Sequence, residues 1–219
     1  PATVYMGVDA RRDHSMRVPR PDITAKIGAP NACNVCHTDK TIDWSVSAIQ
    51  GWLKGKTREP ELAAEPIYAA RTNQPNANQQ LIELANNPSI NTMARSTALG
   101  LLASYPNRLS YDAARQQLSH KDALVRMGAL QALALLPLEQ RWQDISPLLD
   151  DPVRSVRLQA TRLLIGIKGI SPVQQELINR RAKSYIKALR VSADMPNGQL
   201  NLATAYIALG QVKNAEKAY

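Results

Sequence analysis

Apolar residues recur at helical spacing over most of this chain of 219 residues. From about residue 76 onward they fall three and four positions apart, as in helices that bury one face. Short polar turns such as "NNPSIN", "SHKD" and "DDPVR" separate these patterns, and the region has no strand signals and few glycines. The pattern therefore predicts a mainly α protein.

Three of the helical segments align with one another at a constant offset of 31 residues, starting at residues 93, 124 and 155. A shorter helix pattern precedes the turn before each of them. Identical residues fall at the aligned positions: Arg95, Arg126 and Arg157; Ala98, Ala129 and Ala160; and Leu102, Leu133 and Leu164. We expect Ala to let helices approach closely, Leu to fill the layer and each Arg to bond carbonyls of adjoining turns. The repeat predicts an α-solenoid of antiparallel helix pairs and resembles HEAT repeats in their short form.

The last part of the chain, "NGQLNLATAYIALGQVKNAEKAY", resembles a tetratricopeptide repeat. The resemblance rests on residues at the usual positions of that repeat: Leu202, Ala203, Tyr206, Gly210, Ala215 and Tyr219, with Gln199 in place of the usual Trp. Because the chain stops inside the predicted second helix, we expect this repeat to be incomplete. The chain thus divides into a cofactor-binding segment at 1–60, HEAT-like repeats at 61–170 and a tetratricopeptide-like region at 171–219.

Residues 1–60 have a different pattern. A short, irregular, proline-broken stretch, "RRDHSMRVPRPD", precedes an amphipathic helix pattern in "TIDWSVSAIQGWLKG", with Thr41 as the predicted N-cap. Trp44 and Trp52 form a stripe beside the apolar face of that helix, and we expect them to pack a core or to cover a cofactor edge. Between these two parts lies "CNVCH", which holds both cysteines of the chain.

The "CNVCH" motif permits three kinds of chemistry. A disulfide or a pair of free thiols is one, although the strand–helix pattern of thioredoxin-like redox motifs is missing around it. Structural zinc needs four ligands, so His14 or His120 would have to complete the set. Covalent haem c fits all five residues, because positions i, i+3 and i+4 of a helical turn share one face. We favour haem c, attached to Cys33 and Cys36, with His37 as an axial ligand of the iron.

The sixth position of the iron determines the chemistry of such a site. Two histidines favour electron transfer at low potential, whereas an open position allows substrate binding. With only three histidines in the chain, His14 is the candidate second ligand, to this haem or to a neighbouring one. Arg17 and Arg20 are candidate partners of haem propionates, because a guanidinium binds a carboxylate in bidentate fashion. The alternatives are a solvated histidine and a solvated charge cluster.

Composition and charge narrow the function classes. The net charge of +9 is spread along the chain without a long basic run and with little aromatic interleaving, so nucleic-acid binding is disfavoured. The apolar runs are too short to span a membrane. No signal peptide is visible, but the chain opens on Pro1 rather than Met, so a targeting segment could precede it. Since haem c is attached outside the bacterial cytoplasm, we expect a periplasmic or extracellular, cell-surface location.

The stretch "YMGVDARRDHSMRVPRPDITAKIGAPNACNVCHTDK", followed by the two kinds of repeat, resembles a family of bacterial multihaem c-type cytochromes over essentially the whole chain. Members usually carry another C-x-x-C-H-M-P motif just ahead of the "YM" segment. The resemblance therefore implies at least one further haem, N-terminal to Pro1. It also implies electron transfer, with His14 as an axial ligand and with other haem segments or cytochromes as partners.

We expect an electron carrier rather than an enzyme, with protein partners docked on the helical repeats. Two other classes remain open: an interaction scaffold with a structural haem, and a part of a multihaem oxidoreductase with an open iron. A visible spectrum separates the three, because a low-spin haem indicates electron transfer, a high-spin haem indicates an enzyme, and no haem indicates a scaffold.

Overall fold

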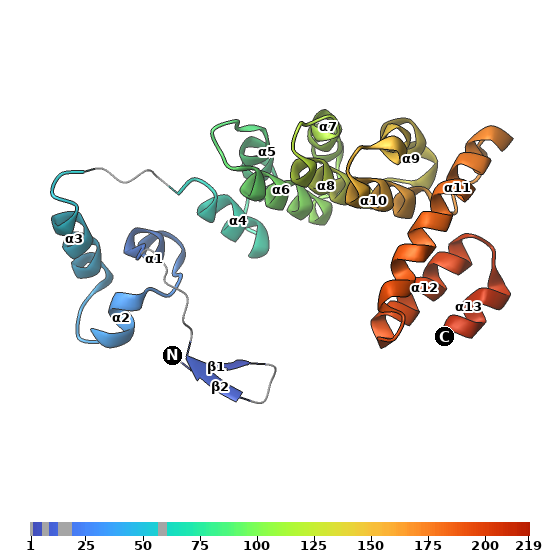
Figure 1. Cartoon of the computed structure of the whole chain (residues 1–219). Helices are drawn as coiled ribbons and strands as arrows, with labels where there is room; N and C mark the ends of the chain where they lie inside the picture. The colour runs from blue at the N-terminus through green and yellow to red at the C-terminus, as the bar shows by residue number, and fades with distance from the viewer. Residues whose placement is uncertain (1, 6–8, 13–18, 57–60) are drawn as a thin grey trace. The chain divides into compact units, whose positions relative to one another are not determined.

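The computed structural model describes residues 2–5, 9–12, 19–56 and 61–219 (Figure 1). The chain divides into two compact units, residues 1–68 and residues 69–219. The boundary falls after Tyr68, inside a helix, whereas the sequence pattern placed it at residue 60. The predicted second and third regions, 61–170 and 171–219, fall largely within one unit.

The first unit contains a β-hairpin and short helices. Strands β1 (Ala2–Tyr5) and β2 (Asp9–Arg12) pair in antiparallel fashion, with Ala2 opposite Arg12 and Tyr5 opposite Asp9. The helices are α1 (Pro21–Ile27), α2 (Ala32–Cys36), α3 (Ile42–Trp52) and α4 (Ala64–Arg71), which continues into the second unit. The hairpin was not predicted, and it overlaps the stretch expected to be irregular, residues 11–22, only at Arg11 and Arg12. Paired strands form hydrogen bonds between their backbone N–H and C=O groups. Helical spacing of apolar residues gives no signal for such a short pair of strands.

The second unit, all of which the structure describes, consists of helices. Its α-helices are α5 (Ala77–Asn86), α6 (Thr92–Leu101), α7 (Arg108–Gln117), α8 (Ala123–Ala132), α9 (Leu138–Ile145), α10 (Arg154–Leu164), α11 (Pro172–Leu189), α12 (Pro196–Ala208) and α13 (Val212–Ala218). Short 3-10 helices cover Leu102–Ser104, Leu133–Leu135, Ser146–Asp150 and Arg190–Ser192. The prediction of a mainly α protein is confirmed.

Helices α5 to α10 form two layers. Helices α6, α8 and α10 pack against one another in sequence order, and α5 and α7 pack against α6 and α8 as a second layer (Figure 1). The residues that recur in the sequence lie between the layers, since Ala98, Ala129 and Ala160 are all fully buried. Leu102, Leu133 and Leu164 are fully buried as well. The sequence repeat thus marks the core of this unit.

The three recurring arginines hold the turns between the helices. Arg126 donates to the carbonyl of His120 at 2.7 Å and Arg157 to that of Pro152 at 2.9 Å, each in the turn before its own helix. Arg95 donates instead to the carbonyl of Ala85 at 2.8 Å, in the last turn of α5. The expected bonding of turn carbonyls is therefore confirmed for Arg126 and Arg157, whereas Arg95 bonds the end of the preceding helix. Arg126 also makes a bidentate pair with the buried carboxylate of Asp151, at 2.7 and 2.8 Å.

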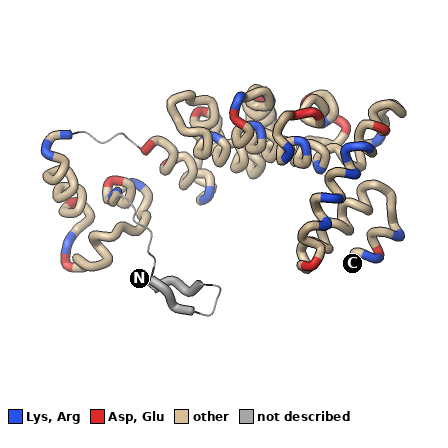
Figure 2. Tube along the Cα trace, viewed as in Figure 1, with Lys and Arg blue, Asp and Glu red and all other residues tan. Residues whose placement is uncertain are grey.

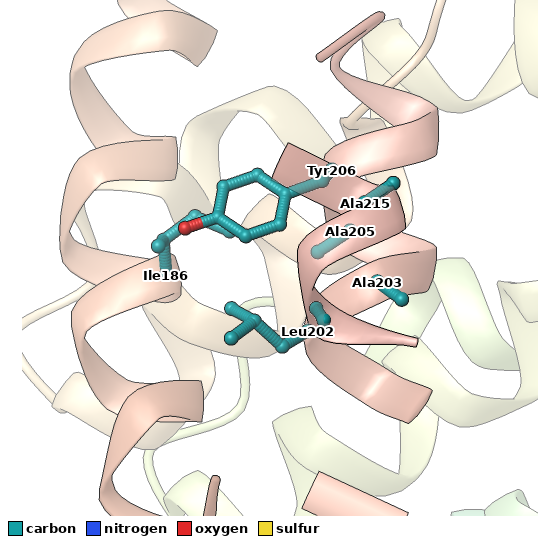
Figure 3. Close-up of a cluster of buried hydrophobic side chains, with 7 residues drawn as sticks. Ile186, Leu202, Ala203, Ala205, Tyr206 and Ala215 are labelled. Atoms are coloured by element: carbon teal, nitrogen blue, oxygen red, sulfur yellow. The ribbon is translucent and has the colours of Figure 1, made fainter. Parts of the chain in front are cut away.

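The end of the chain forms a separate apolar cluster between α11, α12 and α13. Tyr206 reaches from α12 toward Ile186 on α11, above Leu202, while Ala203 and Ala215 close the contact between α12 and α13 (Figure 3). Gly210 makes the turn between α12 and α13 with a positive φ of 72°, which glycine adopts without strain. Among the described residues, no helix combines the length and the apolar character that a bilayer crossing requires.

Candidate functional site

Helix α2 is one turn long and carries the "CNVCH" motif. Asn31 precedes it in extended conformation and caps it, because its side-chain oxygen accepts from the backbone N–H groups of Cys33 at 3.0 Å and Asn34 at 3.1 Å. At the other end, the backbone N–H of His37 donates to the carbonyl of Cys33 at 2.8 Å. The five motif residues thus form a single capped helical turn, as their spacing predicts.

The two thiols and the imidazole are accessible on this turn. Cys33 is half-buried, Cys36 is exposed, and both are free cysteines. His37 is exposed as well, and its ring packs against the indole of Trp44 on α3, with ring centroids 5.0 Å apart and planes tilted by 53°. Trp44 restricts the positions of the imidazole, because this contact limits the rotation of the ring.

Four polar side chains tie α1, α2 and α3 together around the motif. Asn34, between the two cysteines, accepts from the Ser45 hydroxyl at 2.8 Å and from the Asn31 amide at 3.0 Å. Its own amide donates to the carbonyl of Lys40 at 2.9 Å. Asn31 also donates to the Thr24 hydroxyl of α1 at 3.1 Å. Asn34 of the motif therefore fixes α2 against α3, and Asn31, just before the motif, fixes it against α1, without involving the thiols.

Sequence reasoning missed Asn34 and Ser45. A signal was present, because Ser45 lies next to Val46 on the apolar side of the helix pattern that starts at Ile42. Ser45 is fully buried in the structure. A polar residue on the buried side of an amphipathic helix needs a hydrogen-bond partner, and here that partner is Asn34 of the "CNVCH" motif.

The apolar residues around the motif form no core of their own. Among residues 19–56, all of which the structure describes, no Val, Ile, Leu or Trp is buried. Val35, Ile42, Trp44 and Trp52 are instead exposed, the last of them to 72%. The second unit differs, since every fully buried large apolar side chain of the described residues lies there. Trp52 therefore packs no protein core, and of its two expected roles only the covering of a cofactor edge is left.

A cavity of about 390 Å³ opens between α1 and the later part of α3. Its lining includes Pro21, Val46, Ile49 and Leu53, and no residue of the "CNVCH" motif borders it. The motif instead contacts exposed Trp44 through His37.

Of the three remaining predicted site residues, the structure describes only Arg20. His14 and Arg17 lie outside the described residues. Arg20 lies just before α1, and its guanidinium binds the carboxylate of Asp22 in bidentate fashion, from Nε at 2.9 Å and from Nη2 at 2.6 Å. These hydrogen bonds hold the pKa of Asp22 below its ordinary value and raise the pKa of Arg20. Arg20 is thus present near the motif but is already paired with a carboxylate.

The structure bears unequally on the alternatives to haem. Cys33 and Cys36 are free cysteines, so there is no disulfide, whereas a pair of free thiols agrees with the structure. No group of three or more His, Cys, Asp or Glu side chains within the described parts of the chain converges as a zinc site requires. His120, considered as a zinc ligand, belongs to the second unit, where its Nδ1 accepts from the backbone N–H of Asp122 at 3.0 Å.

The chain was compared with protein-family models, with curated proteins and with solved structures, and none of the three comparisons found a match.

Proposed function

We propose that this chain is an electron-transfer c-type cytochrome that relays electrons through covalently bound haem within a multihaem assembly. One observation carries the proposal. The "CNVCH" turn carries two free thiols, exposed Val35 and an exposed imidazole that packs against exposed Trp44, in a segment whose apolar residues form no core. A large, flat, apolar cofactor attached at the motif would cover these side chains, which an isolated protein surface would leave in water.

Each residue of the motif would contribute to holding the cofactor in a different way. The sulfur of Cys33 and the sulfur of Cys36 would each bond to one carbon of a haem vinyl group while the thiol proton is transferred to the other carbon. His37 would bind the iron, with Trp44 limiting the rotation of its ring. Asn34 keeps the turn in place through Ser45 and Lys40. When bound, haem c supplies a reversible one-electron iron couple.

We propose His14 as a second axial ligand and Arg17 and Arg20 as partners of the haem propionates. The proposal rests on the sequence for His14 and Arg17. The structure weakens the case for Arg20, because its guanidinium already binds the carboxylate of Asp22. A propionate would have to share Arg20 with that carboxylate, so Arg17 is the stronger candidate.

The finer architecture belongs to the same proposal. The two-layered helices α5–α10 support a reading as HEAT-like repeats, and the cluster of Ile186, Leu202 and Tyr206 supports a tetratricopeptide-like reading of the C-terminal helices. The array would dock the cytochrome to its own complex or to other proteins. The assembly would contain at least one further haem and would be periplasmic or exposed at the cell surface.

The first experiment tests haem attachment. The protein is exported to the bacterial periplasm together with the cytochrome c maturation proteins, and its c-type haem is measured as the pyridine haemochrome. We expect haem that stays with the polypeptide under denaturing conditions, and its loss in a Cys33→Ser/Cys36→Ser variant. Normal export of the protein without any covalent haem would contradict the proposal and favour the scaffold class.

The second experiment tests the relay. We expect the visible spectrum of the intact assembly to show low-spin haem and His14→Ala to shift one haem to high spin, because a nitrogen ligand is lost. Arg17→Ala serves as the control, since it removes a neighbouring charge but no iron ligand. A high-spin iron in the unaltered protein, with substrate bound at its open position, would favour the oxidoreductase class instead.

A further inference from the structure

A groove of about 740 Å³ lies between α11 and the helices α12 and α13. Its rim carries Lys183, Lys187 and Arg190, together with Asn179 and Asn214. No Asp or Glu lines this groove. Figure 2 shows the Lys and Arg residues that recur along α11. The groove therefore concentrates positive charge, although the charge of the whole chain is spread out.

The cations form one face of a helix. Asn179, Lys183 and Lys187 follow at intervals of four residues on α11, and Arg190 comes directly after its end. This spacing places them on one side of the helix, over a distance of about 10 Å from Lys183 to Arg190. The two lysines are exposed. No ion pair among the described residues joins either lysine or Arg190 to a carboxylate.

Arg190 is held in place by a buried side chain. Its Nη2 donates to the hydroxyl of Tyr206 at 3.0 Å. The Tyr206 ring is buried in the cluster with Ile186 and Leu202, as Figure 3 shows. A guanidinium that is fixed before binding loses less conformational entropy when it meets a ligand. Beneath the charged rim, Ala182, Ile186 and Leu209 give the groove an apolar floor.

A second groove on the same unit contains arginines that are paired with carboxylates of the protein. It lies beside the turns of the repeats and is also lined by arginines. There Arg115 binds Asp144 at 2.8 Å, and Arg126 binds Asp151 at 2.7 Å. Those charges are compensated within the protein, whereas the charges of Lys183, Lys187 and Arg190 are left for a partner.

We propose that the groove between α11 and α12–α13 binds an acidic segment of a protein partner. Carboxylates of the segment would lie against Lys183, Lys187 and Arg190, and its apolar side chains against Ile186 and Leu209. The row of cations and the apolar floor fit an extended or helical peptide rather than a single small anion. The inference deepens the partner docking of the proposed function, but it does not depend on the haem.

The test measures binding of a fluorescein-labelled peptide of alternating Glu and Leu to the complete chain by fluorescence anisotropy. We expect saturable binding that weakens with salt. Lys183→Glu and Lys187→Glu should each weaken binding about fivefold, and the double variant more than about tenfold. Lys168→Glu is the matched control, because it makes the same charge change at an exposed lysine that does not line the groove and should leave affinity unchanged.

Tyr206→Phe tests the positioning of Arg190. The variant keeps the ring and all charges but removes the hydroxyl that accepts from Arg190. We expect about twofold weaker binding with an unchanged salt dependence. A change in salt dependence equal to that of the lysine variants would overturn the positioning role.

Three other outcomes would overturn the proposal itself. The first is unchanged peptide affinity in both lysine variants. The second is tighter binding of phosphatidylserine vesicles or single-stranded DNA that is lost in the same variants. The third is self-association of the chain through these residues. Covalent haem content is measured in every sample, so failure of this proposal is distinguishable from failure of the proposed cytochrome function.

Discussion

Ser45 lies fully buried on α3, and its hydroxyl donates to the Asn34 side chain at 2.8 Å. Asn34 sits between the two cysteines of the motif and also receives a hydrogen bond from Asn31. At the residue scale, a polar contact between side chains thus connects the helix that follows the motif to the motif itself. Asn34 fills a variable position of the C-x-x-C-H signature, whereas Ser45 and Asn31 lie outside it.

Replacing this serine tests that connection. Ser45→Ala leaves the oxygen of Asn34 without its buried donor, and we expect a loss of about 1–2 kcal/mol in the unfolding free energy of the first unit. Ser47→Ala is the matched control, because Ser47 lies exposed on the same helix. The control should be neutral or slightly stabilising, since Ala favours helix. Chemical denaturation followed by tryptophan fluorescence measures both, and equal effects would refute the role of Ser45.

The buried pair of Arg126 and Asp151 allows a second residue-scale prediction. Their side chains are only 9% and 6% exposed, and they make a bidentate contact. Asp151→Asn keeps the shape but leaves the guanidinium charge uncompensated, so we expect the second unit to lose about 3–5 kcal/mol. Arg108→Ala is the comparison, since its side chain is 93% exposed and its pair with Asp112 contributes about 0–1 kcal/mol. Urea unfolding followed by far-UV circular dichroism measures the unfolding free energy of both variants. A small loss of that free energy in Asp151→Asn would show that water reaches the pair and would contradict the prediction.

At the scale of the elements, α6 and α8 approach one another so closely that glycine is required at the contact. A Cβ added at Gly128 would lie 2.5 Å from the carbonyl oxygen of Ser96, which is backbone and cannot rotate away. At Gly100, on the facing helix, the nearest atom would be the end of the flexible Gln131 side chain. The two glycines look equivalent in the sequence, but the packing around them differs.

The same substitution should therefore have different effects at the two positions. Gly128→Ala should destabilise the second unit by about 1–3 kcal/mol, because the helices must separate. Gly100→Ala should be neutral or stabilising by up to about 1 kcal/mol, since Gln131 can rotate and Ala favours helix. Thermal unfolding by calorimetry compares the two variants, and a shift of equal size and sign would contradict the close contact of α6 and α8.

At the scale of the whole molecule, the two units differ in how their apolar surface is covered. The second unit buries large apolar side chains from α5 to α11, among them Leu81, Leu130 and Ile178. The described helices of the first unit, from α1 to α3, bury none. Under the proposed function, the stability of the first unit depends on the cofactor, whereas that of the second unit depends on its own packing.

This difference predicts two separable unfolding transitions in the haem-loaded protein. Cys33→Ser/Cys36→Ser, which removes the attachment of the haem, should abolish or strongly lower the transition of the first unit and leave that of the second unit unchanged. Hydrogen exchange resolved to peptides can assign each transition to residues 19–56 or 69–219. If the variant keeps full protection in α1–α3, the first unit folds without the cofactor and the predicted dependence is wrong.

The sequence by itself determined those features that depend on the spacing of residues close together in the chain. Helical periodicity predicted the helices, and the offset of 31 residues predicted which alanines and leucines are buried. The five residues of "CNVCH" predicted a helical turn with both thiols and the imidazole on it, because i, i+3 and i+4 are neighbours in any helical turn. Its cap, Asn31, was not predicted. Helical spacing did not predict the short hairpin β1–β2. Its strands pair residues such as Ala2 and Arg12, whose separation in sequence is not a helical period.

Tertiary structure alone decided which residues meet across long stretches of chain. Arg126 was expected at carbonyls, but its strongest partner is Asp151, which is 25 residues away in sequence. The link from Asn34 to Ser45, the contact at Gly128 and the row of cations facing α12–α13 likewise arise only when helices pack. The reason is physical: periodicity tells which face of a helix is apolar, but the partner of a polar or small residue depends on the distance and angle between helices.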